Sequence, residues 1–301
     1  MHYTMQDLRS LFVGYTPIHV EPTTTPFSLS DLDVDCPPDV RPSLEEMTEI
    51  TTYTFKGNVI RFFHQGEDCS VHLQHIARFL HKLQTKPIIA DILFSPVKKY
   101  YPADKVFDKS HTNTGYCTGD KVVIYRREEW FKVFIHECIH YFQWERILKQ
   151  PSPEMMTLFH RPFNLYEAYC EVCARVLNCC YISAITRIPV ACLYEIERQY
   201  SIQHMVNVLH HMDIDYSMLF DERHEFKEKT NLFAYVIITA LLMYARYVPP
   251  PKLNLVRSDL FNQLIVKTAK RKSFFHEATS RVPSITTTMS KLNVDEFIQY
   301  H

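Results

Sequence analysis

Glycine is scarce in this chain of 301 residues, which contains only five. None of the five is followed by the Lys-Ser or Lys-Thr pair that completes a phosphate-binding loop. The sequence therefore contains no glycine-rich motif for holding a nucleotide. The glycines are Gly14, Gly57, Gly66, Gly115 and Gly119.

An excess of charge of either sign is also missing. The chain has 33 basic and 34 acidic residues, so its net charge of -1 creates no overall field that would attract nucleic acid. Its 18 tyrosines and 20 phenylalanines are spread through apolar segments and are not interleaved with Lys and Arg as in a base-stacking surface. We therefore expect no nucleic-acid partner.

A membrane-spanning run is missing as well. The longest apolar stretch, LFAYVIITALLMYARY from Leu232 to Tyr247, is interrupted by Thr239 and ends at Arg246. It falls short of the roughly 20 apolar residues that cross a bilayer, so we expect a buried helix and no membrane partner. The first residues, MHYTMQDLRSLFVGY, lack the basic segment and apolar run of a signal peptide.

Cysteines are present, but not in the arrangement of a disulfide framework. Their number is odd and most lie in apolar helical segments, which favours free thiols in a reducing compartment and an intracellular, cytoplasmic protein. Cys170 and Cys173 form a C-x-x-C, yet no second pair follows at zinc-ribbon spacing, so we interpret both as core thiols. The nine cysteines are Cys36, Cys69, Cys117, Cys138, Cys170, Cys173, Cys179, Cys180 and Cys192.

Proline marks the N-terminal part of the chain. Residues 15–42 contain six prolines, which should block helix and central strand and predict an extended arm within residues 1–50. A flexible tail and a docking arm for a protein partner both fit this composition. The six are Pro17, Pro22, Pro26, Pro37, Pro38 and Pro42.

The rest of the chain changes character near Arg126, and it predicts an α+β fold. The pattern before this point predicts a hairpin over Thr51–Phe63 that turns at Gly57-Asn58, a helix over Ser70–Leu83, and two strands. The strands are expected at Ile88–Ser95 and Val122–Arg126. After it, helical patterns cover residues 128–148, 164–185, 189–211, 229–248 and 255–271. We divide the chain into a mixed part, residues 51–150, and a helical part, residues 151–301.

Residues 136–140 read HECIH and match the H-E-x-x-H pattern of zinc peptidases. The segment from Glu128 to Arg146 has neither Pro nor Gly, so it can form a buried helix with His136 and His140 one turn apart on one face. Two imidazoles at this spacing can share one zinc ion, and Glu137 can reach a water bound to it. The alternative is a pair of core histidines whose polar atoms are satisfied by neighbouring groups.

A catalytic zinc needs a third protein ligand, and the segment NLYEAYCEVCARVLNCC provides Glu167 and Glu171 four residues apart. On a helix both carboxylates face the same way. One can ligate zinc while the other accepts a hydrogen bond from a ligating histidine. The alternative is an exposed acidic pair of the ordinary i,i+4 kind.

These two segments resemble the gluzincin clan of zinc metallopeptidases, in which an HExxH helix is followed by a helix carrying ExxxD or ExxxE. The resemblance implies a zincin-like fold in which the active-site helix lies between a small sheet with an edge strand and a helical subdomain. It also implies that His136, His140 and Glu167 ligate zinc, that Glu137 is the general base, and that Glu171 orients a ligand. Glu171 stands where many members have Asp, which leaves open which of the two glutamates contacts the metal.

A second passage fits the same family. Ser110–Trp130 looks like the edge strand that gluzincins place before the active-site helix. One departure lies in the later helix, where Tyr166 stands at a position that is Asn in some members. An open edge there can pair with an extended peptide, with Asn113, Thr114, Gly115 and Tyr116 as substrate contacts; an ordinary turn is the alternative. The passage from SPVKKYYP to EEWFKVFIHE is also similar to gluzincin-like proteins of large DNA viruses.

Together these features predict a zinc metallopeptidase that acts on a peptide or protein substrate. The alternative is a structural or interaction protein that keeps the fold, with zinc as a structural ion or with its activity lost. The oxyanion of a reacting peptide needs one further donor. The sequence offers six and does not choose among them: Tyr194, His204, His210, His211, Tyr235 and Tyr244.

Overall fold

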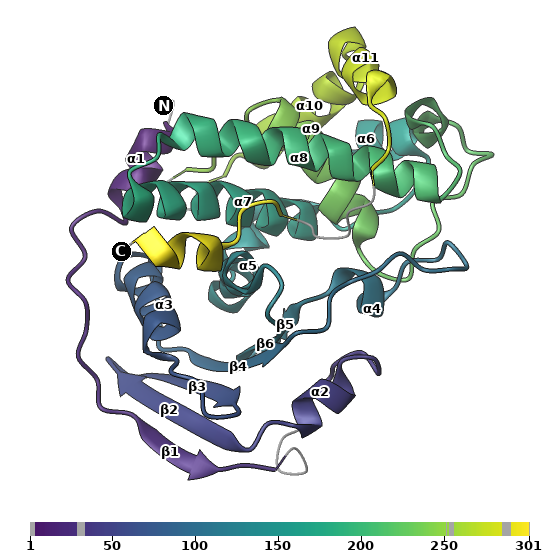
Figure 1. The fold of residues 1–301 in the computed structure, drawn as a ribbon. Coiled ribbons are helices and arrows are strands. Elements are labelled where there is room, and N and C mark those ends of the chain that lie inside the picture. Colours follow the sequence, from purple (N-terminus) through teal and green to yellow (C-terminus); the bar gives the residue numbers. More distant parts are fainter. Residues whose placement is uncertain (1–3, 29–33, 251, 253–255, 285–289, 301) are drawn as a thin grey trace.

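The computed structural model describes residues 4–28, 34–250, 252, 256–284 and 290–300. A six-stranded mixed sheet in the N-terminal part is followed by a mostly helical region, which confirms the predicted α+β class (Figure 1). The strands are β1 (Thr23–Pro26), β2 (Glu49–Phe55), β3 (Asn58–His64), β4 (Ile89–Ser95), β5 (Gly115–Cys117) and β6 (Val122–Arg126). The helices that lie before or between these strands in the chain are α1 (Met5–Ser10), α2 (Arg41–Glu45), α3 (Ser70–Leu83) and α4 (Lys109–Thr112).

The helical region begins directly after β6. Its longest members are α5 (Trp130–Phe142), α7 (Leu165–Thr186) and α8 (Val190–His211). The others are η2 (Trp144–Ile147), α6 (Pro153–Phe159), η3 (Tyr216–Phe220), η4 (Phe233–Ile238), α9 (Thr239–Tyr244), α10 (Ser258–Ala269), α11 (Lys272–Ser280) and η6 (Val294–Tyr300).

The sheet has the order β1-β2-β3-β4-β6-β5. Strands β1, β2 and β3 are antiparallel, whereas β3, β4 and β6 run parallel to one another. Strand β5 pairs antiparallel with β6 and forms one edge of the sheet. The three-residue β5 therefore leaves one row of backbone groups without a strand partner within the described sheet.

The predicted hairpin forms, but it turns one residue earlier than the sequence indicated. Lys56 and Gly57 have φ angles of 48° and 79°, the left-handed values that a two-residue hairpin turn requires. Asn58 already belongs to β3 and pairs with Phe55. Its side chain accepts a hydrogen bond from the backbone N–H of Ile88 and bonds with Gln84, so tertiary contacts draw it into the strand.

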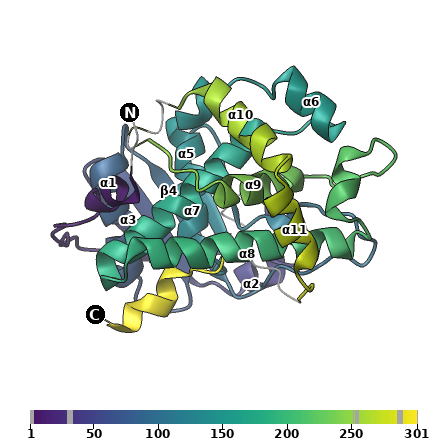
Figure 2. The same ribbon diagram turned by 90° about the horizontal axis from the view of Figure 1, so that it is seen from above.

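Alternating side chains place the two faces of the sheet in different cores. Phe62, Ile92 and Ile124 belong to the main core beneath α3 and α5, while their neighbours Phe63 and Leu93 face a smaller core under α2. Helices α5, α7 and α8 then stack away from the sheet in Figure 1, and Figure 2 shows α8 crossing the outer side of this stack. Helix α5 is thus enclosed between the sheet and α7.

Helix α7 is long and apolar enough to cross a membrane by length and composition, but 94% of its apolar window is buried inside the protein. The predicted apolar helix over Leu232–Tyr247 is also buried, and it is divided into the π-helical turn η4 and the α-helix α9. The part of the last predicted helix near residue 255 lies outside the described residues. Its described part, α10, begins at Ser258.

The proline-rich arm is attached to the sheet along part of its length. Thr23–Pro26 pairs with β2 as an edge strand, the position in which a sheet tolerates proline. Helix α2 has Pro42 in its first turn, where the missing N–H is not needed, so the expectation that these prolines exclude all helix was wrong there. The described residues do not decide whether the arm has a protein partner, and the division at residues 50 and 150 stays a prediction.

Candidate metal centre

Helix α5 brings the HECIH residues into the middle of the molecule. It follows β6 after a short turn in which Glu129 has a φ angle of 50°, and it is capped at its C-terminal end by Gln143, which has a φ angle of 59°. All of its residues except His140 are buried, as expected for a helix covered by the sheet on one side and by α7 on another. His136 and His140 point from α5 toward the N-terminal part of α7.

Helix α7 supplies the acidic residues. The side chain of Asn164 accepts a hydrogen bond from the backbone N–H of Tyr166 and so caps the helix start. Glu167 lies in the first turn and Glu171 one turn later. Their side chains are 16% and 2% exposed, so they are not the exposed acidic pair of the alternative interpretation.

Three side-chain atoms form a nearly equilateral triangle. Nε2 of His136 lies 3.2 Å from Nε2 of His140 and 3.2 Å from Oε2 of Glu167, and the remaining side, from His140 to Glu167, is 3.1 Å. Ligands of a tetrahedral zinc with bonds of about 2.0–2.1 Å lie about 3.3 Å apart. These three residues therefore form a group that can hold a metal ion.

Glu171 has a different position from Glu167. Its Oε2 is 3.2 Å from Nδ1 of His136, on the side of the ring away from the triangle. Lys132 donates to both of its carboxylate oxygens at 3.1 Å, and Arg175 donates to Oε1 at 2.8 Å. Arg175 in turn bonds with the buried Glu197. Glu171 thus joins a histidine of the triangle to a buried chain of alternating charges.

His140 has its own carboxylate partner. Its Nδ1 is 3.2 Å from Oε1 of Glu145, which η2 places behind the ring. The Sγ of Cys170 is 3.7 Å from the same nitrogen. Both discounted cysteines, Cys170 and Cys173, are buried, but Cys170 also contacts this histidine.

Glu145, Cys170 and His140 form a second group with metal-ligand spacing, and it shares its histidine with the first. In the second group the histidine atom is Nδ1, and Cys170 is fully buried. All three residues of the triangle border the cleft that also contains Glu137, whereas Cys170 does not. We therefore take the triangle as the candidate metal position and Glu145 as the candidate partner that orients His140.

The electrostatic environment favours a cation at the triangle. Burial alone would raise the pKa of Glu167, but its hydrogen bonds with His136 and His140 outweigh burial and lower that pKa. Burial would likewise lower the pKa of His136, yet Glu167 and Glu171 raise it. The carboxylates around the two rings thus stabilise positive charge there.

Glu137 borders the same cleft as the triangle without belonging to the triangle. Within the described residues its carboxylate has no hydrogen-bond partner, and burial raises its pKa. It lines an open cleft of about 440 Å³ together with His136, His140 and Glu167. A cleft of this size lies within the range of ligand pockets, about 300–1,000 Å³.

Tyr235 is the one member of the six predicted oxyanion donors that borders this cleft. Its hydroxyl donates to Oε2 of Glu167 at 3.2 Å, and its ring centroid is 5.8 Å from that of His136. It lies on the π-helical turn η4, a local geometry that often occurs at functional sites. Asn231, one turn earlier, donates to the other oxygen of Glu167 at 3.3 Å.

The other five candidates are engaged elsewhere or lie outside the cleft. Tyr194 donates to the backbone of Met243, Tyr244 donates to Ser273, and His211 contacts the backbone oxygen of Pro102. His204 is buried behind the charged chain, and His210 is exposed at the end of α8.

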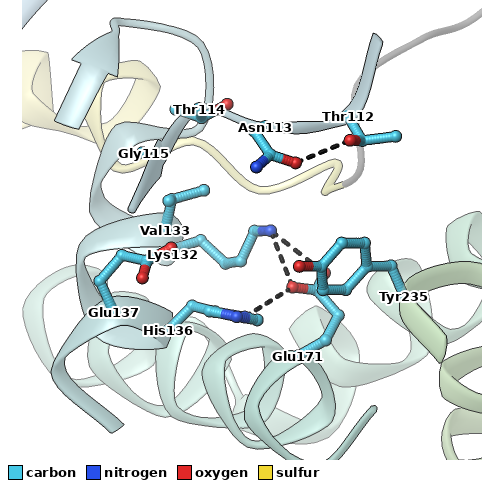
Figure 3. A pocket seen from close by; sticks show the side chains of 10 residues that line it. All are labelled: Thr112, Asn113, Thr114, Gly115, Lys132, Val133, His136, Glu137, Glu171 and Tyr235. Carbon is cyan, nitrogen blue, oxygen red and sulfur yellow. Dashed lines mark hydrogen bonds and ion pairs between the residues drawn. The ribbon is translucent and has the colours of Figure 1, made fainter. Parts of the chain in front are cut away.

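Strand β5 forms the wall of the cleft that faces helix α5. The residues just before β5 contribute to a second, smaller pocket. Asn113, Thr114 and Gly115 lie above Lys132 and Glu137 in this pocket, whose volume of about 30 Å³ holds one or two water molecules (Figure 3). Lys132 is fully engaged, because it pairs with Glu129 as well as with Glu171.

The predicted substrate contacts differ in what they offer. Asn113 and Gly115 border both the cleft and the small pocket. A Cβ on Gly115 would lie 2.5 Å from the carbonyl oxygen of Val123, so only glycine fits where β5 meets β6. The side chain of Tyr116 packs against the core under α2, and its hydroxyl accepts a hydrogen bond from the N–H of Asp35.

Sequence reasoning missed four residues of this centre: Lys132, Glu145, Arg175 and Asn231. Lys132 lies one helical turn before His136, and Arg175 lies one turn after Glu171, so helical spacing could have suggested both. Nothing in the sequence points to Glu145 or Asn231, because loops and a separate helix bring them to the site.

The chain matches no protein-family model, no curated protein and no solved structure. Its interpretation therefore depends on the geometry of the site.

Proposed function

We propose that this protein is a zinc-dependent metallopeptidase of the gluzincin type with a zincin-like fold. The triangle of His136 Nε2, His140 Nε2 and Glu167 Oε2 carries the proposal. Two imidazoles and one carboxylate are the donor set of a catalytic zinc, and all three residues border the cleft. Glu145 and Glu171 support it, because each contacts the outer nitrogen of one histidine.

Zinc held by these residues would polarise a substrate carbonyl and lower the pKa of a bound water. Glu137 has a free carboxylate in the cleft, and it accepts the proton of the attacking water and passes it to the leaving amine. The raised pKa of Glu137 suits a group that must both take up and release a proton. Tyr235, which donates to Glu167, can turn its hydroxyl toward the negative charge that develops on the substrate oxygen.

Strand β5 supports a peptide as the substrate. It is an edge strand that borders the cleft opposite Glu137, so an extended peptide can add to the sheet through backbone hydrogen bonds. This pairing would hold the scissile bond next to the triangle. No feature of the described residues favours the non-catalytic alternative over this function.

Metal analysis and hydrolysis of a mixed peptide library test the proposal together. We expect about one zinc per chain in the wild type, and its loss in His136→Ala, His140→Ala and Glu167→Ala. Glu137→Gln should keep the zinc and lose hydrolysis, while Glu154→Gln, an exposed change on α6, should retain both. Folded wild type that binds no zinc contradicts the metal centre. Zinc without hydrolysis in the wild type contradicts the enzyme and favours a structural protein.

A further inference from the structure

A further pocket lies far from the candidate metal centre, at the other end of α7. Its volume is about 350 Å³, and its walls come from α3, the C-terminal end of α7, the arm near Tyr15 and the η6 segment. In Figure 1 these elements meet at the side of the molecule where both chain ends lie. Glu167 and Ala184 are 17 residues apart on α7, which places this pocket about 25 Å along the helix from the candidate metal centre.

The charged side chains of this pocket are both cations. Arg78 and Arg187 line it, no carboxylate does, and neither guanidinium pairs with a carboxylate in the described part of the chain. Arg78 lies over the ring of Tyr15, with its Cζ 5.1 Å from the ring centroid. A guanidinium has donors only, so both side chains can bind an anionic group that enters the pocket.

His75 adds a buried imidazole to the wall. It is 9% exposed, and its Nδ1 lies 2.6 Å from the hydroxyl of Tyr181. Its other ring nitrogen, Nε2, has no hydrogen-bond partner among the described residues. A buried polar atom without a partner is costly.

The remaining walls are apolar and held in place. Val71, Ile185 and Phe297 line the pocket, and Val71 is 41% exposed although it is a large apolar side chain. Gln74 fixes the arm, since it accepts from the hydroxyl of Tyr15 and bonds in both directions with the backbone of Ile18. The pocket is therefore formed by packed elements on all of these sides.

We propose that this pocket binds a small amphipathic anion. Its carboxylate or phosphate head group accepts hydrogen bonds from Arg78 and Arg187, and a short aliphatic chain packs against Val71, Ile185 and Phe297. Two arginines beside an apolar wall complement a molecule with an anionic head group and an aliphatic chain, and the volume lies within the range of small-molecule pockets. The proposal does not depend on the peptidase activity.

Four compounds with the same tail test the proposal by isothermal titration calorimetry on the full chain: octanoate, octyl phosphate, octanol and octylamine. We expect octanoate or octyl phosphate to bind, and whichever binds more tightly identifies the head group. Octanol and octylamine should bind at least about ten-fold more weakly, because they lack the charge that the arginines recognise. Equal binding of octanol, or no binding of either anion, overturns the proposal.

Variants locate the site. Arg78→Gln and Arg187→Gln should each weaken binding of the anion about ten-fold, and Ala184→Phe, which fills the pocket, should abolish it. Arg271→Gln, an exposed change outside the pocket, is the matched control and should bind as the wild type does. Because carboxylates also ligate zinc, His136→Ala must retain the affinity. Arg187 is exposed, so its variant remains informative even if Arg78→Gln does not fold. Unchanged affinity in Arg187→Gln contradicts the proposed head-group site.

Discussion

Oε2 of Glu171 lies 3.2 Å from Nδ1 of His136 in the buried space between α5 and α7. This contact occupies one ring nitrogen and leaves the other, Nε2, facing Glu167 and His140. Glu171 also holds the buried cations Lys132 and Arg175, so one carboxylate serves both the candidate metal centre and the stability of the helix pair.

Glu171→Gln is therefore expected to impair both. Glutamine keeps the size of the side chain but removes the charge that balances Lys132 and Arg175, and breaking a buried ion pair costs about 3–5 kcal/mol. Zinc affinity should fall about 10–100-fold, because His136 loses its charged partner. Urea unfolding of metal-free proteins measures the first effect, and competition with a chelator measures the second. Unchanged stability would show that the buried cations do not need Glu171.

Glu145→Gln should separate these two effects. Glu145 contacts Nδ1 of His140 at 3.2 Å and pairs with no buried cation in the described residues. We expect zinc affinity to fall about ten-fold or more, with a smaller loss of unfolding free energy in the metal-free protein than Glu171→Gln causes, because Glu145 balances no buried Lys or Arg among the described residues. The same two assays apply. A loss of stability as large as that of Glu171→Gln contradicts an orienting role for Glu145.

Tyr235→Phe should slow peptide hydrolysis. Loss of one donor to a developing oxyanion typically lowers kcat about 10²–10³-fold. Tyr244→Phe is the matched control, because it removes a hydroxyl that bonds with Ser273 and lies outside the cleft. We expect kcat to fall in the first variant only, with zinc content unchanged in both. Equal kcat values in wild type and Tyr235→Phe would exclude this tyrosine as the donor.

His204 predicts an acid-sensitive stability. Burial lowers the pKa of its imidazole to about 3, and the nearby cations Arg175 and Lys99 add to the shift. The unfolded chain takes up this proton near pH 6.5, whereas the folded chain does not until about pH 3. The contribution of the uncharged His204 to the free energy of unfolding is therefore fully present above pH 6.5. It declines below pH 6.5, by about 2 kcal/mol at pH 5.

In His204→Leu the free energy of unfolding should fall less between pH 7 and pH 5 than in the wild type. Leucine fills a similar volume and removes two buried ring nitrogens that have no partner among the described residues, so stability at pH 7 should be equal or higher. Urea unfolding at pH 7, 6 and 5 measures the difference. His210→Leu, an exposed change on the same helix, is the control and should follow the wild-type pH dependence. The same decline in His204→Leu as in the wild type would exclude His204 as its source.

Several local elements could be predicted because their signals lie within a few residues. The helix at Ser70–Leu83 and the strand at Val122–Arg126 have the predicted bounds. Where prediction failed, a distant contact was responsible. Gln84 and Ile88 draw Asn58 into β3 and move the hairpin turn, and pairing with β2 makes a strand of the proline-rich residues 23–26.

For the site, the sequence by itself determined that His136 and His140 share one helical face, and that Glu167 and Glu171 share another, because both relationships follow from the α-helical repeat. It did not determine which glutamate faces the histidines, nor that Glu145, Asn231 and Tyr235 join them. Only the packing of α5 against α7 and η4 decided this, since it sets the direction of each side chain across elements far apart in the chain. In that packing Glu167 completes the triangle and Glu171 lies behind His136, held there by two buried cations.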